Sequence, residues 1–148
     1  MPLLNYTTAI SADKTVNEIQ RILAAHGAKA VLNEYDNNGY IVAVSFKIEL
    51  GGRMLGFRLP SDWRPVQQVL EKQRLTRKYL TQEHALKVAW RIVKDWVEAQ
   101  MAIGETRMVS FDQVFLPYAI TKDGTTLYEH VKKSGLLLPP PDDGQDKV

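Results

Sequence analysis

Residues 81–104, TQEHALKVAWRIVKDWVEAQMAIG, carry the longest helical pattern of the chain and two of its three tryptophans. Apolar side chains recur in it at the steps that place them along one stripe of an α-helix. That stripe consists of Ala85, Val88, Ala89, Ile92, Trp96, Ala99 and Ile103. Thr81 is a typical N-cap residue, and Gly104 is a typical left-handed C-terminal residue. The pattern predicts a helix over residues 81–104, and the rest of the fold is expected to pack around it.

Three strands are predicted before this helix, at residues 30–35, 40–50 and 53–59. Turn signals separate them: DNNG at residues 36–39 and GG at residues 51–52. Connections this short cannot cross over a sheet, so the three strands are expected to form an antiparallel meander.

The N-terminal part is predicted to hold one more strand and a helix. The stretch NYTTAI, residues 5–10, is rich in strand-forming residues. Thr15 and Glu18 have the spacing of a capping box, which predicts that a helix begins at Thr15. Gly27 is expected to end this helix, with His26 as a cap at its last turn.

The remaining elements are shorter. Asp62 is expected to cap a helix that runs to about residue 73, with Pro65 in its first turn. Ser110 is expected to cap a short helix, FDQVF. Pro117 predicts that the following stretch, FLPYAIT, is extended, because the residue before a proline is disfavoured in the helical region. A turn at residues 122–124 and a short helix within residues 125–133 complete the pattern.

These elements describe an α+β protein: a small antiparallel sheet packed against a few α-helices. Residues 1–133 are expected to form a single domain, and the Pro-rich, acidic residues 134–148 a disordered tail. Leu136–Leu138 in that tail are candidates for docking on the domain or on a partner subunit. The chain has no cysteine, no secretory signal pattern and no apolar run of membrane-spanning length, so a cytoplasmic protein without membrane contact is expected.

The charge is distributed unevenly. Residues 1–46 contain 3 Lys or Arg and 4 Asp or Glu, residues 47–94 contain 11 and 4, and residues 95–148 contain 5 and 9. The net charges are therefore −1, +7 and −4. A basic segment between neutral and acidic ones suggests an anionic ligand near the middle of the chain, although solvated lysines and arginines on helix surfaces would give the same composition.

The residues that carry catalysis in known enzymes do not form a recognisable set. The three histidines lack metal-ligand spacing, and there is no G-x-S-x-G elbow, phosphate-binding GxxxxGK[ST] loop or GxGxxG fingerprint. Asp95 and Glu98 have the spacing for a shared acid/base or magnesium site, but they are better explained as surface partners of Arg91 and Lys94. A protein without enzymatic activity, cofactor or metal is expected.

Candidate ligand-binding residues lie on the long helix and in the third strand. His84, Lys87, Arg91, Lys94 and Glu98 share one polar, mostly basic helix face, and Trp90 borders it. An arginine fork beside an indole can hold a phosphate next to a stacked base. Phe57 and Arg58 lie on opposite faces of the third strand, and Tyr118 follows the short helix. The alternative is that the cations solvate the back of the helix and that the aromatic residues pack in the core.

A second basic stretch lies between the two helices. Lys72, Arg74, Arg77 and Lys78 could follow a nucleic-acid backbone. Only Tyr79 is interleaved with these cations as an aromatic residue, so a solvated linker is the alternative interpretation.

The strings AWRIVKDWVEAQMA (89–102), GFRLP (56–60) and VFLPYAIT (114–121) resemble a family of small phage and prophage proteins. The resemblance covers residues 5–131 and implies no assigned reaction. The build, an antiparallel sheet followed by two helices, is also similar to phage anti-Thoeris sponges, which bind cyclic nucleotide signals between the subunits of an oligomer.

The resemblance implies a non-enzymatic phage protein that sequesters a cyclic nucleotide immune signal in the host cytoplasm, as a homo-oligomer. The resemblance itself assigns no binding residue. From the residue patterns above, the expected ligand-binding residues are Arg58, Lys87, Arg91 and Lys94 for phosphates, with Phe57, Trp90 or Tyr118 for a base. Two alternatives remain open: a nucleic-acid-binding accessory protein of phage replication or recombination, and a direct protein inhibitor of a host defence system.

Overall fold

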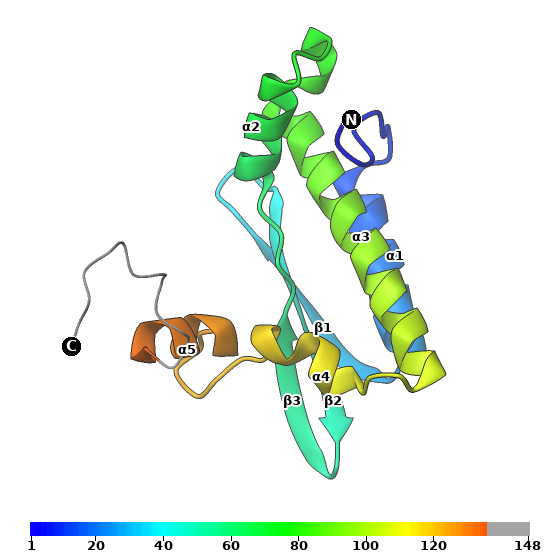
Figure 1. Cartoon of the computed structure of the whole chain (residues 1–148), viewed down its shortest axis with the longest axis vertical. Coiled ribbons are helices and arrows are strands. Elements are labelled where there is room, and N and C mark those ends of the chain that lie inside the picture. Colours follow the sequence, from blue (N-terminus) through cyan, green and yellow to red (C-terminus); the bar gives the residue numbers. More distant parts are fainter. Residues whose placement is uncertain (136–148) are drawn as a thin grey trace, which may run out of the picture.

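The computed structural model describes residues 1–135 of the chain. In chain order the elements are α1 (Ala12–Ala25), β1 (Ala28–Tyr35), β2 (Ile41–Leu50), β3 (Arg53–Arg58), α2 (Trp63–Lys72), η1 (Arg77–Tyr79), α3 (Gln82–Thr106), α4 (Phe111–Phe115), η2 (Leu116–Tyr118) and α5 (Leu127–Ser134), where η marks a 3-10 helix. Figure 1 shows α1 and α3 side by side, α2 at one end of the long axis, and α5 beyond the other side of the sheet. The predicted α+β class is confirmed.

The sheet is the predicted antiparallel meander, with strand order β1-β2-β3. Its register shifts at both ends of the β1–β2 pair, between Ala28 and Ala30 and between Glu34 and Tyr35. Such irregularities bend and twist a strand pair. One face of the sheet packs against α1 and α3. The other, more open face is partly covered, because Ala43 and Ser45 are buried there and Ile120 lies over Gly56.

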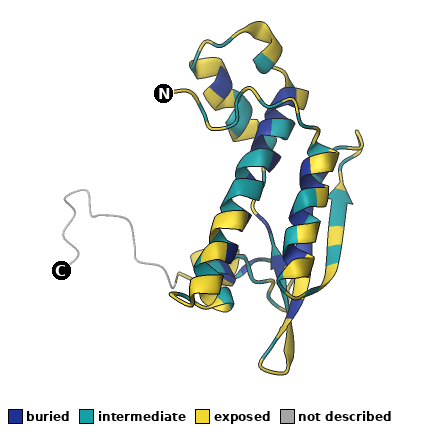
Figure 2. Ribbon diagram, turned by 90° about the vertical axis from the view of Figure 1, so that its right-hand side faces the viewer, coloured by how far each residue is buried: buried dark blue, intermediate teal, exposed yellow. Residues whose placement is uncertain are grey.

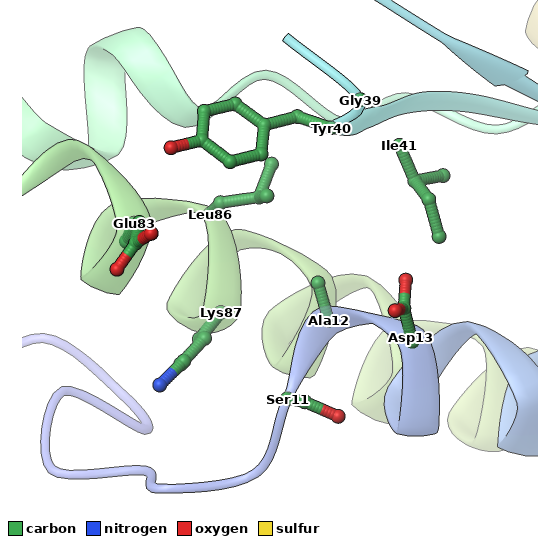
Figure 3. Close-up of a pocket in the computed structure, with 9 residues that line it drawn as sticks. All are labelled: Ser11, Ala12, Asp13, Gly39, Tyr40, Ile41, Glu83, Leu86 and Lys87. Atoms are coloured by element: carbon green, nitrogen blue, oxygen red, sulfur yellow. The ribbon is translucent and has the colours of Figure 1, made fainter.

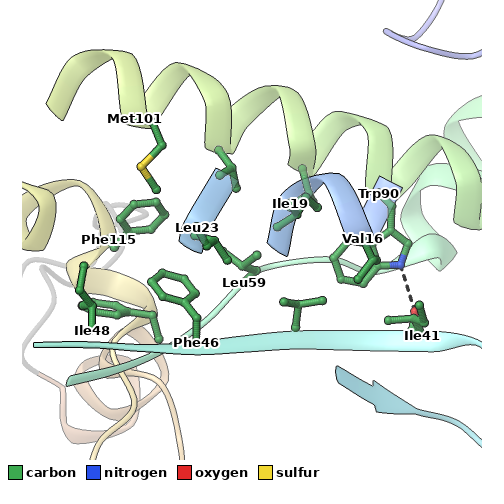
Figure 4. Packing of buried hydrophobic residues seen from close by; sticks show 14 of the residues in the cluster. Val16, Ile19, Leu23, Ile41, Phe46, Ile48, Leu59, Trp90, Met101 and Phe115 are labelled. Atoms are coloured by element: carbon green, nitrogen blue, oxygen red, sulfur yellow. Dashed lines mark hydrogen bonds between the residues drawn. The ribbon is translucent and has the colours of Figure 1, made fainter. Parts of the chain in front are cut away.

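The core lies between that covered face and the two long helices (Figure 4). It contains Val16, Ile19 and Leu23 of α1, Val44, Phe46 and Ile48 of β2, and Phe57, Trp90 and Phe115 from later elements. Phe46 stacks on Phe57 with ring centroids 5.3 Å apart, and Phe115 meets Phe46 edge-on. The aromatic packing fixes how the meander sits beneath α3.

Helix α3 begins as predicted, because the side chain of Thr81 accepts a hydrogen bond from the backbone N–H of His84. The predicted stripe is only partly buried. The residues that face the sheet and α1 are Trp90, Val93, Val97 and Met101, while Ala85 and Val88 face α2. Ala99 is exposed, and His84, which was expected on the polar face, is buried. The helix has two apolar faces because it is packed between α2 and the sheet, so a single stripe could not describe it.

The prediction that Gly104 ends this helix is wrong. The helix continues through Gly104 to Thr106, and Arg107 adopts the left-handed conformation instead, with φ 62°. The extra turn carries Glu105, whose carboxylate lies 3.0 Å from Nε2 of His26 at the end of α1. The part of α3 beyond Gly104 therefore provides a contact between the C-terminal ends of α1 and α3.

Two predictions at the N-terminus are also wrong. Residues 5–10 form no strand; Asn5 has a left-handed φ of 65°, and the chain turns there. Tyr6 of this segment, together with Leu3 before it, packs against the apolar cluster between α2 and α3 instead. Helix α1 begins at Ala12 with Ser11 as its cap, one turn before the predicted Thr15. Thr15 is fully buried within the helix.

In the C-terminal half, Asp62 caps α2 and Ser110 caps α4, as predicted. The extended conformation predicted for residue 116 is wrong. Leu116 is helical, and α4 runs directly into η2, where Pro117 occupies an early position that tolerates proline. The turn and helix predicted after residue 121 are present. Ser134 and Gly135 belong to the end of α5, and the remaining predictions for the tail, including Leu136–Leu138, lie outside the described residues.

Candidate nucleic-acid interface

Three of the cations nominated from the sequence are already paired with carboxylates. Arg91 forms an ion pair with Glu18 of α1, and its side chain is only 14% exposed. Lys94 pairs with Glu98 on the same helix. Arg58 donates to a carboxylate oxygen of Glu34 across 2.8 Å on the open face of the sheet. The Arg91 and Arg58 pairs each join two elements, and the Lys94 pair lies within α3, so the three cations do not converge on one site.

The nominated aromatic residues serve mainly as packing groups. Trp90 is fully buried, and its indole N–H donates to the carbonyl of Ile41 across 3.0 Å. Phe57 is buried in the core. Tyr118 is half-buried and meets Trp96 edge-on, with ring centroids 5.4 Å apart. Neither Trp90 nor Phe57 exposes a ring face for a base.

Lys87 lines a shallow cavity of about 270 Å³ between the start of α1, the start of β2 and α3 (Figure 3). The ring of Tyr40 lies above Leu86 at one side of it. The cavity also contains the carboxylates of Asp13 and Glu83, so its single lysine is outnumbered by acidic groups. An anionic ligand is therefore not favoured here. These residues come from three separate segments, which no sequence motif connects.

The four cations of the second basic stretch are arranged differently. We call Lys72, Arg74, Arg77 and Lys78 the basic tip. They lie between the end of α2 and η1, at the upper end of the molecule in Figure 1. All four are exposed, and none of them forms an ion pair within residues 1–135.

The connection that carries the basic tip is ordered by packing and hydrogen bonds. Leu75 and Leu80 pack against a small apolar cluster between α2 and α3. The side chain of Gln67 donates to the carbonyl of Leu80 across 2.9 Å, and Gln73 accepts from the backbone of Leu3 across 3.0 Å. The apolar residues point inward and the cations outward, so the basic side chains are presented from a folded base.

Arg74 departs from ordinary backbone geometry, with a left-handed φ of 51°. This conformation is unfavourable for most residues other than glycine. It follows the end of α2, where the N–H of Arg74 donates to the carbonyl of Glu71 across 3.1 Å. The reversal turns the chain toward η1 and keeps the cations of the basic tip near one another.

The charge around the basic tip is strongly biased. Residues 63–82 contain five Lys or Arg residues and one acidic residue, Glu71, a net charge of +4. The fifth cation, Arg64, is paired with Asp62 at 3.3 Å. Much of the positive charge of the central segment is thus gathered on one end of the molecule, where like charges favour an anionic partner.

The aromatic ring nearest the basic tip is enclosed. Tyr79 contacts Tyr6 edge-on, lies against His84, and has Nζ of Lys78 5.0 Å from its ring centroid. Its ring is therefore occupied by neighbours, and the tip offers charge without an adjacent free stacking surface. Proteins that bind single strands generally combine the two.

The shifted pKa values lie away from the basic tip. A hydrogen bond with Glu105 and a second with the carbonyl of Ile22 raise the pKa of His26, against a smaller opposing effect of burial. Hydrogen bonds from Thr121 and Thr125 keep the pKa of the Asp123 carboxyl well below its usual range. Both groups stabilise a helix end or a turn.

Two features are absent from residues 1–135: a metal-binding cluster and a membrane-spanning helix. No group of three or more His, Cys, Asp or Glu side chains is placed to hold a metal ion. No helix in this part of the chain has the length and apolar character needed to span a membrane. Comparison of the chain with protein-family models, curated proteins and solved structures gave no match.

Proposed function

We propose that this protein binds the phosphate backbone of nucleic acid through the basic tip and acts as a binding protein without turnover. The observation that carries the proposal is the exposure of four unpaired cations on one ordered connection. Lysine and arginine side chains bound to phosphates release condensed counterions, which supplies affinity without base recognition. Sequence-independent binding is therefore expected.

Duplex nucleic acid is the favoured form. The enclosed ring of Tyr79 leaves the basic tip without a neighbouring platform for unstacked bases. Binding to phosphates alone requires a dense array of charge, and a duplex carries about one negative charge per 1.7 Å of its axis. We expect a duplex to bind at least as tightly as a single strand of equal length.

Fluorescence anisotropy with labelled duplex and single-stranded oligonucleotides tests the proposal. The variant neutralises the basic tip by Lys72→Gln, Arg74→Gln, Arg77→Gln and Lys78→Gln. The matched control neutralises four exposed cations elsewhere, by Lys14→Gln, Arg53→Gln, Lys122→Gln and Lys133→Gln. The proposal expects the first variant to lose binding and the control, with the same net charge, to retain it. Equal losses in both variants would contradict it.

Sequestration of a cyclic nucleotide is the rival function. Most of its nominated residues are paired or buried in the single chain, and Lys87 lies among carboxylates. The cations of the basic tip form no ion pair, so the geometry favours nucleic acid. Thermal melting with cyclic ADP-ribose isomers, cyclic dinucleotides and cyclic trinucleotides separates the two functions. A ligand at about 100 times its Kd stabilises a protein by roughly 2.7 kcal/mol, a shift of several degrees. Such a shift, without binding to duplex, would replace the proposal. Binding to duplex through the basic tip would suit an accessory protein of phage replication or recombination.

A further inference from the structure

Strand β1 forms an open edge of the sheet. It pairs with β2 alone, and within residues 1–135 no strand pairs with its outer side. The opposite edge of the sheet, strand β3, has backbone partners. Ala119 forms a bridge with Phe57 of β3, and the N–H of Ile120 donates to the carbonyl of Gly56 across 2.8 Å. Part of the β3 edge is therefore covered, while β1 presents unpaired backbone groups along its length.

Between its two register shifts, the open edge lacks two other features that often protect such strands, proline and lysine. It contains no proline, and its only lysine, Lys29, lies at the register shift near one end. None of its eight residues is buried. In Figure 2 the strand at the right-hand side is coloured only in the teal and yellow of intermediate and exposed residues. Leu32 is 61% exposed and Tyr35 is 58% exposed. A long edge with large apolar side chains favours pairing with another strand.

We propose that β1 pairs antiparallel with β1 of a second copy of this chain, with the two-fold axis at Leu32. The two three-stranded sheets would then form one continuous sheet of six strands. A two-fold axis perpendicular to the sheet keeps every side chain on its own face, so a residue can face only itself or one an even number of positions away. Centring on Leu32 places the two exposed leucines opposite each other and Ala30 opposite Glu34.

The charges of β1 suit a second copy in this orientation. The strand carries one cation near its start, Lys29, and one anion near its end, Glu34. In the proposed register Glu34 lies opposite Ala30 and Lys29 opposite Tyr35, so no like charges meet, whereas in-register parallel pairing would place the two Glu34 side chains next to each other. Residues 30–34 lie between the two register shifts and are centred on Leu32, so a regular stretch of about 17 Å is available for the new ladder.

The absence of cysteine from the chain allows a clean cross-linking test. Directly opposed residues of an antiparallel pair have Cβ atoms about 4.5–5.5 Å apart, close to the separation in a disulfide. Leu32→Cys is expected to give a disulfide-linked dimer under mild oxidation. The control is Met54→Cys, because Met54 is similarly exposed, at 53%, but lies on β3. Cross-linking at position 32 should be at least about tenfold faster.

The register is tested by mixing two differently tagged variants, Ala30→Cys and Glu34→Cys. The proposed register predicts that mixed disulfide dimers form faster than dimers of either variant alone.

Light scattering gives an independent measurement of the association. The unmodified protein is expected to be a dimer, and Leu32→Glu is expected to weaken its association at least about tenfold while the far-UV circular dichroism spectrum stays unchanged. Because Leu32 is exposed in the single chain, this change should leave the fold intact.

A monomer at every concentration tested would overturn the proposal. A dimer in which position 32 cross-links no faster than position 54 would overturn it as well, since another surface would then be responsible. The neutralised basic tip is expected to dimerise normally, so this test and that of nucleic-acid binding can fail separately.

Discussion

The indole N–H of Trp90 on α3 donates to the backbone carbonyl of Ile41 on β2 across 3.0 Å in the buried core (Figure 4). Ile41 lies next to the register shift at the end of the β1–β2 pair. The bond therefore joins the longest helix to an irregular point of the sheet, where a carbonyl without a partner would be costly.

Replacing Trp90 by phenylalanine should destabilise the protein by about 1–3 kcal/mol, because the carbonyl of Ile41 loses its buried donor. Chemical denaturation measures this change. Trp63→Phe is the control, since Trp63 is half-buried and its indole N–H forms no hydrogen bond with the described part of the chain. An equal cost for both substitutions would show that the hydrogen bond contributes little.

The ion pair between Arg91 and Glu18 should be structural. Arg91→Met is expected to cost about 1–3 kcal/mol, because it removes a largely buried guanidinium and leaves the half-buried carboxylate of Glu18 without its partner. Arg58→Met should cost less than about 1 kcal/mol, because the Arg58–Glu34 pair is far more exposed. Denaturation curves for both variants, with Glu18→Gln to complete a double-mutant cycle, measure the difference. Unchanged stability in Arg91→Met, with loss of binding to a cyclic nucleotide, would restore Arg91 as a ligand-binding residue.

Replacing Gly104 tests where α3 ends, because the sign of the change in stability depends on whether Gly104 lies inside the helix. It lies inside α3, and a methyl group added there would meet no atom within 4 Å. Gly104→Ala should therefore stabilise the protein by about 1 kcal/mol. Gly124→Ala should destabilise it, because Gly124 has a φ of 85°. Thermal or chemical denaturation measures both. A destabilising Gly104→Ala would mean that the helix ends at Gly104.

The contact between His26 and Glu105 predicts a pH effect. Because the pKa of His26 is raised in the folded protein, its contribution to stability is complete below the ordinary value near 6.5 and is lost as the pH rises through the folded value. An NMR titration should show the raised pKa and its decrease in Glu105→Gln. Glu98→Gln, on the same helix, should leave it unchanged. An ordinary pKa in the unmodified protein would contradict the contact.

Much of the fold follows from local patterns. The turns at residues 36–39 and 51–52 determine the meander, and Thr81, Asp62 and Ser110 mark helix starts through their capping side chains. The errors occur where tertiary contacts decide. Residues 5–10 have strand-forming side chains, but no strand of the sheet pairs with them. The sequence places Trp90 at the border of a polar helix face, whereas in the fold α2 and the sheet cover α3 on two sides and Trp90 is buried.

Only part of the candidate interface can be predicted from the sequence. The cations at residues 72–78 are visible in it, and the single acidic residue within residues 63–82 is the signal that sets them apart. Whether a cation is paired depends on residues distant in the chain, as Glu18 shows for Arg91 and Glu34 for Arg58. That information exists only in the folded arrangement.

The most direct test of nucleic-acid binding is the salt dependence of duplex affinity in the unmodified protein, the neutralised basic tip and the matched control. Four phosphate contacts predict a slope of log K against log salt of roughly −3.6, or a loss of roughly a hundredfold between about 50 and 200 mM salt. The account predicts this slope for the unmodified protein and the control, and a slope near zero for the neutralised tip. The same slope in all three proteins, or no binding to duplex at low salt, would contradict it.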